Sequence, residues 1–134
     1  NYLVDQDIPL KIFEMMRVYL TSKVSFLFFL NIFLLIVGSL MDIFSAIVVV
    51  VPLIIPVARD FGVDPVHLAI IFLTNLEIGY LHPPIGINLF IASNRFNKPI
   101  TELYWASIPF VILLVIALMI LTYIPSLSLF WFNT

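Results

Sequence analysis

The sequence predicts an all-α integral membrane protein with a re-entrant helical hairpin, a broken transmembrane helix and a final transmembrane helix. The first observation is composition: 63% of the 134 residues are hydrophobic and 10% are charged, whereas soluble domains have about 45–50% and about 25%. The second is a pair of short apolar runs joined by a polar segment. The third is a membrane-length apolar segment interrupted by two prolines.

Composition also excludes several classes of function. A net charge of −2 gives no indication of a nucleic-acid partner, and the absence of cysteine excludes disulfides and thiolate metal sites. His67 and His82 lack a metal-ligand pattern, and no acid pair or Ser/His dyad of recognisable spacing indicates an enzyme. The chain starts without methionine and has few hydrophobic passes for a transporter, so we expect it to be part of a longer polypeptide.

Residues 1–23 mix charged and apolar side chains. Asp7 can cap a helix that opens near Pro9, and the apolar residues that follow recur at i, i+3 and i+4. This pattern predicts an amphipathic connecting helix at the membrane surface. A polar connector packed on the protein fits the pattern equally well.

Residues 24–58 are interpreted as the re-entrant hairpin, with arms 24–38 and 42–58 around the tip Gly38–Asp42. Each arm has about 14–16 residues, and a full span needs about 20. The alternative is one kinked helix of about 35 residues with Asp42 buried in it. An unpaired carboxylate at mid-membrane is costly, so Asp42 should face protein or water in either arrangement.

Residues 59–94 are predicted to form a discontinuous transmembrane helix broken at 82–86. A helix cannot continue undisturbed through Pro83 and Pro84, because proline lacks an N–H and clashes with the preceding turn. Gly62 is a plausible stop for the preceding helix, and Asp64 followed by Pro65 is typical of a helix start. His67 is expected at the membrane interface.

Residues 99–134 are predicted to hold the C-terminal transmembrane helix. The run from Trp105 to Ile124 is about 20 residues long, and aromatic residues stand at both of its ends. The basic residues do not determine the orientation, because a re-entrant hairpin divides them evenly between the two membrane sides.

The two breaks are where we expect the chemistry. Half-helices that end within the membrane direct their carbonyl ends towards cations and their N–H ends towards carboxylates. Hard oxygen donors favour sodium. The candidate sodium-binding residues, through backbone or side chain, are Gly38, Ser39, Asp42, Thr74, Asn75, Gly79, His82, Pro83 and Gly86, and the candidate substrate-binding residues are Ser39, Pro84 and Asn88.

Other roles remain open for several of these residues. The small residues could simply allow close helix packing. Asp42 could ligate a cation, cap the second arm or pair with a basic residue outside this segment. Glu77 could be a proton or cation site, or make a structural hydrogen bond. His82 could offer a ring nitrogen to the site, although a hydrogen bond to a freed carbonyl is the simpler role.

Four blocks of sequence carry a resemblance to a known family: Gly38–Asp42, Pro52–Pro56, Gly62–His67 and Asn75–Phe90. In order and spacing they resemble the C-terminal third of the large membrane (M) subunit of TRAP transporters, the tripartite ATP-independent periplasmic transporters. The resemblance implies one half of an inverted-repeat, elevator-type transporter. It also implies sodium-coupled import of organic acids, often carboxylates, across the bacterial inner membrane, with no other cofactor.

The same resemblance implies several partners: the rest of the large subunit, a small membrane subunit, a periplasmic substrate-binding protein and the lipid bilayer. It places Arg95 and Lys98 in the cytoplasm. The family commonly has threonine where this chain has His82, so a ligand role for that side chain is in doubt while the backbone role is not. Two alternatives remain, a carboxylate transporter that needs no binding protein and a membrane scaffold subunit that does not transport.

Overall fold

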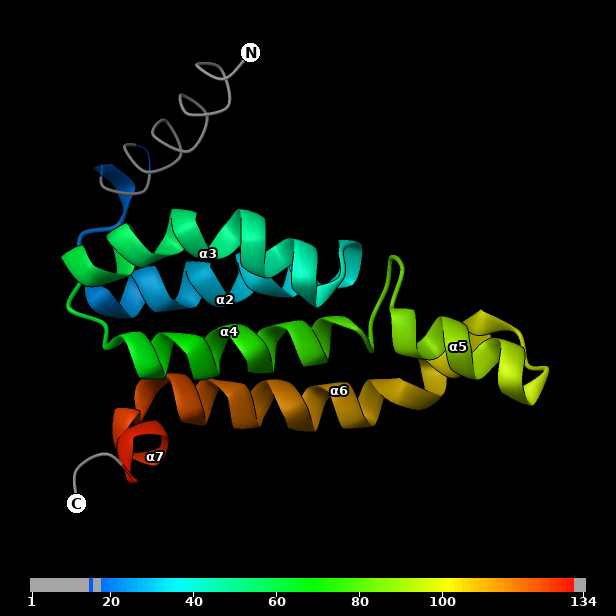
Figure 1. Cartoon of the computed structure of the whole chain (residues 1–134). Coiled ribbons are helices and arrows are strands. Elements are labelled where there is room, and N and C mark those ends of the chain that lie inside the picture. Colours follow the sequence, from blue (N-terminus) through cyan, green and yellow to red (C-terminus); the bar gives the residue numbers. More distant parts are fainter. Residues whose placement is uncertain (1–14, 16–17, 132–134) are drawn as a thin grey trace, which may run out of the picture.

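The computed structural model of the chain describes residue 15 and residues 18–131, and the regular structure within these ranges is helical (Figure 1). The helices are α2 (Lys23–Leu40), α3 (Ile43–Asp60), α4 (Pro65–Gly79), α5 (Ile87–Phe96), α6 (Ile100–Tyr123) and α7 (Pro125–Leu129). Three of them, α2, α3 and α6, are long and apolar enough to cross a membrane. The prediction of an all-α membrane protein is confirmed. The predicted amphipathic helix at 1–23 lies almost entirely outside the described residues.

The chain reverses direction between α2 and α3. Met41 has an extended backbone, with φ −140° and ψ 157°, and Asp42 begins the next helix as its N-cap. The two apolar runs are therefore separate helices that run in opposite directions and not one kinked helix (Figure 1). Each has 18 residues, or about 27 Å at 1.5 Å per residue, so the arms are longer than 24–38 and 42–58. The additional residues are Lys23, Ser39 and Leu40 in α2 and Arg59 and Asp60 in α3.

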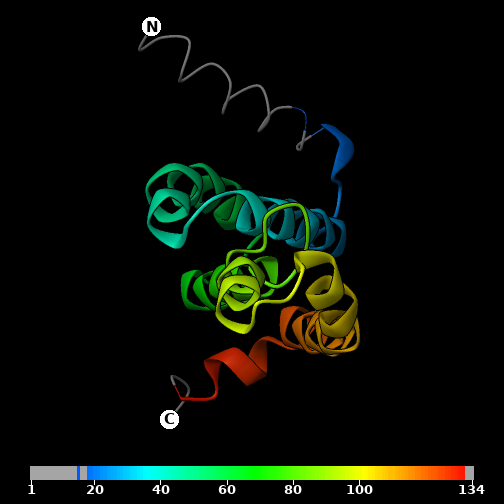
Figure 2. The same cartoon turned by 90° about the vertical axis from the view of Figure 1, so that its right-hand side faces the viewer.

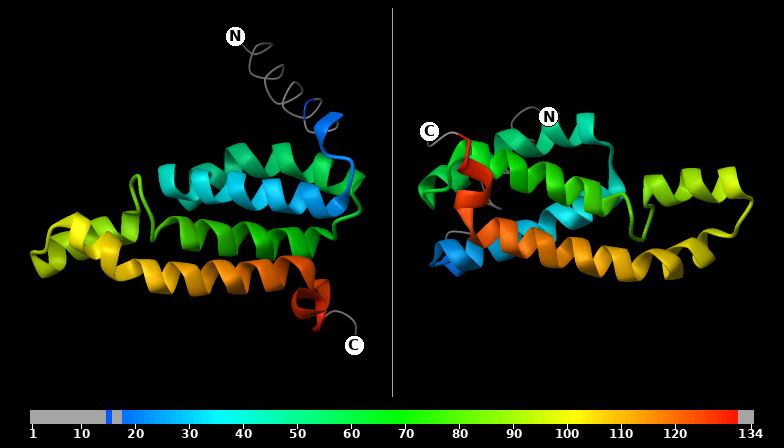
Figure 3. Two further views of the ribbon diagram at one scale, coloured as in Figure 1. Left: turned by 180° about the vertical axis from the view of Figure 1, so that it is seen from behind. Right: turned by 90° about the horizontal axis from the view of Figure 1, so that it is seen from below.

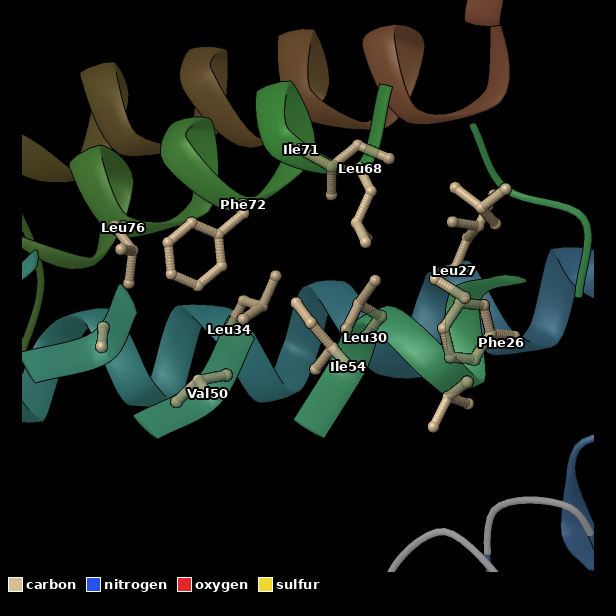
Figure 4. Packing of buried hydrophobic residues seen from close by; sticks show 14 of the residues in the cluster. Phe26, Leu27, Leu30, Leu34, Val50, Ile54, Leu68, Ile71, Phe72 and Leu76 are labelled. Carbon is tan, nitrogen blue, oxygen red and sulfur yellow. The ribbon is translucent and has the colours of Figure 1, made fainter. Parts of the chain in front are cut away.

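Helix α4 runs parallel to α2 and antiparallel to α6. Viewed from the end, α4 lies between the α2–α3 pair on one side and α6 with α7 on the other (Figure 2). The core fills the space between α2, α3 and α4 (Figure 4). Its buried side chains include Phe26, Leu30 and Leu34 of α2, Val50 and Ile54 of α3, and Leu68, Ile71, Phe72 and Leu76 of α4.

Sequence signals set the ends of these helices. Asp64 Oδ1 accepts from the backbone N–H groups of Val66 and His67 at 2.8 and 3.3 Å, with Pro65 in the first turn of α4. Gly62 adopts φ +75° just after α3. Both predicted boundaries are confirmed.

The chain between α4 and α5 is irregular. Beyond this break α5 continues away from the hairpin, and α6 returns alongside α5 and then α4 (Figure 3). The break and the hairpin tip therefore meet in the middle of the molecule.

Candidate functional site

The hairpin tip touches the end of α4 through two glycines. A Cβ atom built on Gly79 would lie 2.6 Å from the carbonyl carbon of Gly38, 2.7 Å from its Cα and 2.9 Å from the amide nitrogen of Ser39. A Cβ on Gly38 would lie 2.9 Å from the Cα of Leu76. These are backbone atoms, so no side-chain rotation could make room. Only glycine at both positions allows α2 and α4 to approach this closely.

The contact joins two helix ends of the same polarity. Because α2 and α4 run in parallel, the C-termini of both helices lie at this contact. The last four carbonyls of a helix lack partners within the regular helix, and the C-terminus carries a partial negative charge. At the end of α4 the carbonyls of Leu76, Ile78 and Gly79 accept from N–H groups of the following turn, which leaves each a second lone pair. Two such ends side by side repel one another unless a cation or hydrogen-bond donors lie between them. This arrangement is suited to binding a small cation.

At the tip, Asp42 caps its own helix. One carboxylate oxygen accepts from the Ser45 N–H at 3.0 Å and the other from the Ser45 hydroxyl at 2.6 Å. The capping role left open in the sequence is confirmed. Ser39 is 1% exposed, and its hydroxyl donates to the carbonyl of Ile36 at 2.7 Å, so in this conformation it serves its own helix.

The break runs from Tyr80 to Gly86. Gly86 adopts φ +58°, and a Cβ there would lie 2.9 Å from the carbonyl oxygen of His82. The Asn88 N–H crosses the break to the carbonyl of Tyr80 at 3.2 Å. Nδ1 of His82 lies 2.6 Å from the carbonyl of Pro83, and because a carbonyl only accepts, Nδ1 is the donor. The expected hydrogen bond from His82 to a freed carbonyl is confirmed.

The N-terminus of α5 opens onto the break without a side-chain cap. Its first N–H groups lack the usual Ser, Thr, Asp or Asn side-chain acceptor, and that of Asn88 donates instead to the Tyr80 carbonyl. Such a helix start favours an anion. Asn88 lies in this first turn with an exposed side chain, next to the exposed Pro84.

Asn75 lies in a buried polar network one turn before Gly79. Its Nδ2 donates to Asn31 Oδ1 at 2.7 Å and to the Ile71 carbonyl at 2.8 Å, and Asn31 Nδ2 donates to Thr122 Oγ1 at 3.0 Å. These bonds link α2, α4 and α6. Asn75 Oδ1 is buried and has no hydrogen-bond partner within the described part of the chain.

The structure thus brings together some of the predicted residues. Gly38, Ser39 and Gly79 form one backbone contact, and Pro83, Pro84, Gly86 and Asn88 surround the adjacent break. The side chain of Thr74 is directed to its own helix, donating to the Ile70 carbonyl at 2.7 Å. Glu77 is exposed on α4.

Sequence reasoning missed four polar residues that hold this region. They are Asn31 and Thr122 in the network, and Tyr104 and Ser107, whose hydroxyls reach the carbonyls of the break. The available signal was a polar residue inside an otherwise apolar span, which is costly unless it has a partner. That signal marks Asn31 but does not name the helix it contacts.

The comparisons with known proteins place the chain in a family. The family model described as "Tripartite ATP-independent periplasmic transporter, DctM component" matches residues 2–127. The isethionate TRAP transporter permease protein DctMQ of Oleidesulfovibrio alaskensis is 37% identical over 131 residues, which are 98% of this chain and 21% of that protein. The C4-dicarboxylate TRAP transporter large permease protein DctM of Pseudomonas aeruginosa is 38% identical over 129 residues, 96% of this chain and 30% of that protein.

A similar protein is the C4-dicarboxylate large permease DctM of Vibrio cholerae, 36% identical over 128 residues, 96% of this chain and 28% of that protein. The chain therefore spans about a fifth to a third of the length of these relatives. The family model covers nearly all of the sequence, and the relatives are transporter permeases by name. The chain belongs to the DctM component family of the TRAP transporters.

Proposed function

We propose that this chain is the C-terminal part of a sodium-coupled secondary transporter that imports small organic acids across the bacterial inner membrane. Family membership supports transport, and relatives named for C4-dicarboxylates and for isethionate support a small organic anion as substrate. A periplasmic binding protein would deliver the substrate. A small membrane subunit and the remainder of the large subunit would complete the complex.

The contact of Gly38 with Gly79 is the observation that supports sodium as the coupling ion. It places the carbonyl ends of α2 and α4 together beside a break that frees more backbone groups. Neutral oxygen donors with few formal charges favour a monovalent hard cation over a divalent one. Within the described residues, no group of three or more His, Asp or Glu side chains could hold a metal ion. Sodium fits this donor set.

The substrate anion is assigned to the uncapped start of α5. The groups proposed to bind it are the side chain of Asn88 in the first turn of α5, the backbone at Pro84 in the break, and Ser39 at the hairpin tip. Sodium bound at the carbonyl ends would add positive charge beside the anion. Each ligand would raise the affinity for the other by the same factor, because this coupling is reciprocal.

We further propose that the tip and break move together, carrying the ion and the substrate between the two sides of the membrane as an elevator does. The buried network of Asn31, Asn75 and Thr122 supports this, because it fastens α2, α4 and α6 into one body. A non-transporting scaffold would have no need for two interrupted helices. Glu77 is the one acidic residue of α4 that offers a proton-coupled alternative.

The test uses the complete transporter, with both membrane subunits, reconstituted in liposomes. Uptake of labelled C4-dicarboxylate and isethionate is measured with an inward sodium gradient or an inward proton gradient, with and without the binding protein. We expect uptake only with sodium and the binding protein, and a higher melting temperature in sodium because a ligand of the folded state stabilises it. Full-rate uptake in a proton gradient without sodium, with no effect of sodium on melting, would overturn the proposal. Uptake without the binding protein would favour the alternative carboxylate transporter.

A further inference from the structure

Helix α6 holds the break between α4 and α5 by three side chain-to-backbone contacts. The hydroxyl of Tyr104 lies 3.1 Å from the carbonyl oxygen of Pro84 and 3.2 Å from that of Ile85. The hydroxyl of Ser107 lies 3.3 Å from the carbonyl oxygen of Leu81. Because the two side chains stand three residues apart, they share one face of α6. That face lies against the break from one end to the other.

These contacts solve a problem that the break itself creates. Interrupting a helix frees carbonyl groups, and at membrane depth a freed carbonyl needs a donor from the protein or from a polar cavity. Three carbonyls of the break have local donors: that of Tyr80 accepts from the Asn88 N–H, that of Gly86 from the Phe90 N–H, and that of Pro83 from the ring of His82. The donors nearest to the other three carbonyls come from α6: the single hydroxyl proton of Tyr104 is shared between Pro84 and Ile85, and that of Ser107 between Leu81 and the Tyr104 carbonyl.

Hydrogen bonds within the break and hydrogen bonds from α6 constrain the break in different ways. A hydrogen bond between two groups of the break does not determine how the break is oriented relative to the other helices. A bond from α6 ties the loop to a second helix, which also packs along α4 and α5. Tyr104 and Ser107 therefore determine how the end of α4 and the start of α5 are presented to the hairpin tip.

We propose that Tyr104 and Ser107 are positioning residues that hold the broken helix in its ion- and substrate-binding geometry. This inference rests on the proposed sodium-coupled transport. In this proposal neither hydroxyl touches the ion or the substrate. Each acts through the carbonyls that it engages, so its loss loosens the break and weakens ion binding while the helices stay folded.

Tyr104→Phe tests this directly, because it removes one hydroxyl and keeps the ring. Tyr123→Phe is the matched control. The Tyr123 hydroxyl also donates from α6 to a backbone carbonyl, that of Val24 at 3.1 Å, but at the opposite end of the helix. The two variants remove the same chemical group from the same helix. Ser107→Ala is a milder second test of the same face.

The complete transporter carrying each variant is assayed for sodium-dependent uptake. We expect Tyr104→Phe to raise the half-saturating sodium concentration about tenfold, which corresponds to about 1.4 kcal/mol of lost binding free energy. Ser107→Ala should shift it in the same direction by less, because that hydroxyl also donates to the Tyr104 carbonyl at 2.9 Å. Tyr123→Phe should leave it at the wild-type value.

Hydrogen exchange provides a readout that does not depend on sodium. Backbone amides of residues 85–88 should exchange faster in Tyr104→Phe than in Tyr123→Phe, measured without sodium or substrate. If both variants match the wild type in half-saturating sodium and in exchange at 85–88, the positioning role is refuted. If the wild type shows no sodium dependence, the proposed function fails instead, and the exchange comparison still decides whether α6 holds the break.

Discussion

Replacing Gly79 by alanine is the sharpest test of the contact between the hairpin tip and the broken helix. The added methyl group would lie 2.6 Å from the carbonyl carbon of Gly38 and 2.7 Å from its Cα, whereas ordinary contact begins at 3.4 Å. No side-chain rotation relieves a clash with backbone. The two helix ends must therefore separate by about 0.8 Å, the difference between ordinary contact and the shorter of these distances.

The energetic cost follows from two opposing effects. Overpacking of a closely packed contact costs about 1–3 kcal/mol. Alanine in place of glycine within a helix stabilises the helix by up to about 1 kcal/mol. The net loss of stability should reach about 2 kcal/mol. The displacement of about 0.8 Å should affect ion binding more than stability, because the distances from a metal ion to its ligands vary by only about 0.2 Å. We therefore expect ion binding to suffer more than folding.

The assay compares Gly79→Ala with Gly62→Ala in the complete reconstituted transporter. Alanine at Gly62 is strained by φ +75°, but it meets no atom within 4 Å among the described residues and lies at the far end of the hairpin. Both variants should melt at a lower temperature, and only Gly79→Ala should lose sodium-dependent uptake per folded protein. Equal uptake by the two variants at saturating substrate and limiting sodium would refute the reasoning.

Three further predictions concern the break, the tip and the network. Pro83→Ala combined with Pro84→Ala should reduce uptake far more than the amount of folded protein, since a continuous helix withdraws the freed carbonyls; normal uptake by a well-expressed double variant would contradict it. Asp42→Asn should retain most stability and partial uptake because asparagine also caps helices, whereas complete loss of sodium dependence would identify Asp42 as a ligand. Asn31→Leu should lower the unfolding free energy by about 0.6–1.7 kcal/mol, the range for hydrogen bonds between membrane helices; an unchanged melting temperature would show that its bond to Thr122 contributes nothing.

Local chemistry made much of the fold predictable. Asp64 and Pro65 start α4, and Asp42 caps α3, because these residue types satisfy N–H groups within two or three residues of themselves. The prolines at 83 and 84 end the helix for an equally local reason. The positions of these helix ends in the chain were therefore predictable.

The partners across helices could not be predicted. The position of His67 at the membrane interface stays a prediction. Its side chain is buried between helices, with Nδ1 2.8 Å from the Ser128 hydroxyl and Nε2 3.0 Å from the Thr122 carbonyl. Thr122 and Ser128 are 55 and 61 positions away from His67 in the chain, and no short-range sequence pattern indicates such contacts.

The sequence by itself determined the membrane class, the helices and the two interruptions, because each depends on hydrophobic length or on residues adjacent in the chain. Only the tertiary structure decided which faces meet. Helices α2, α4 and α6 are apolar around most of their circumference, so they lack the amphipathic stripe that marks a buried face in soluble proteins. Close packing then decides the register. Gly38 lies on Gly79 because two backbones can touch only where neither carries a side chain, and Tyr104 lies on the break because that is where unsatisfied carbonyls need a donor.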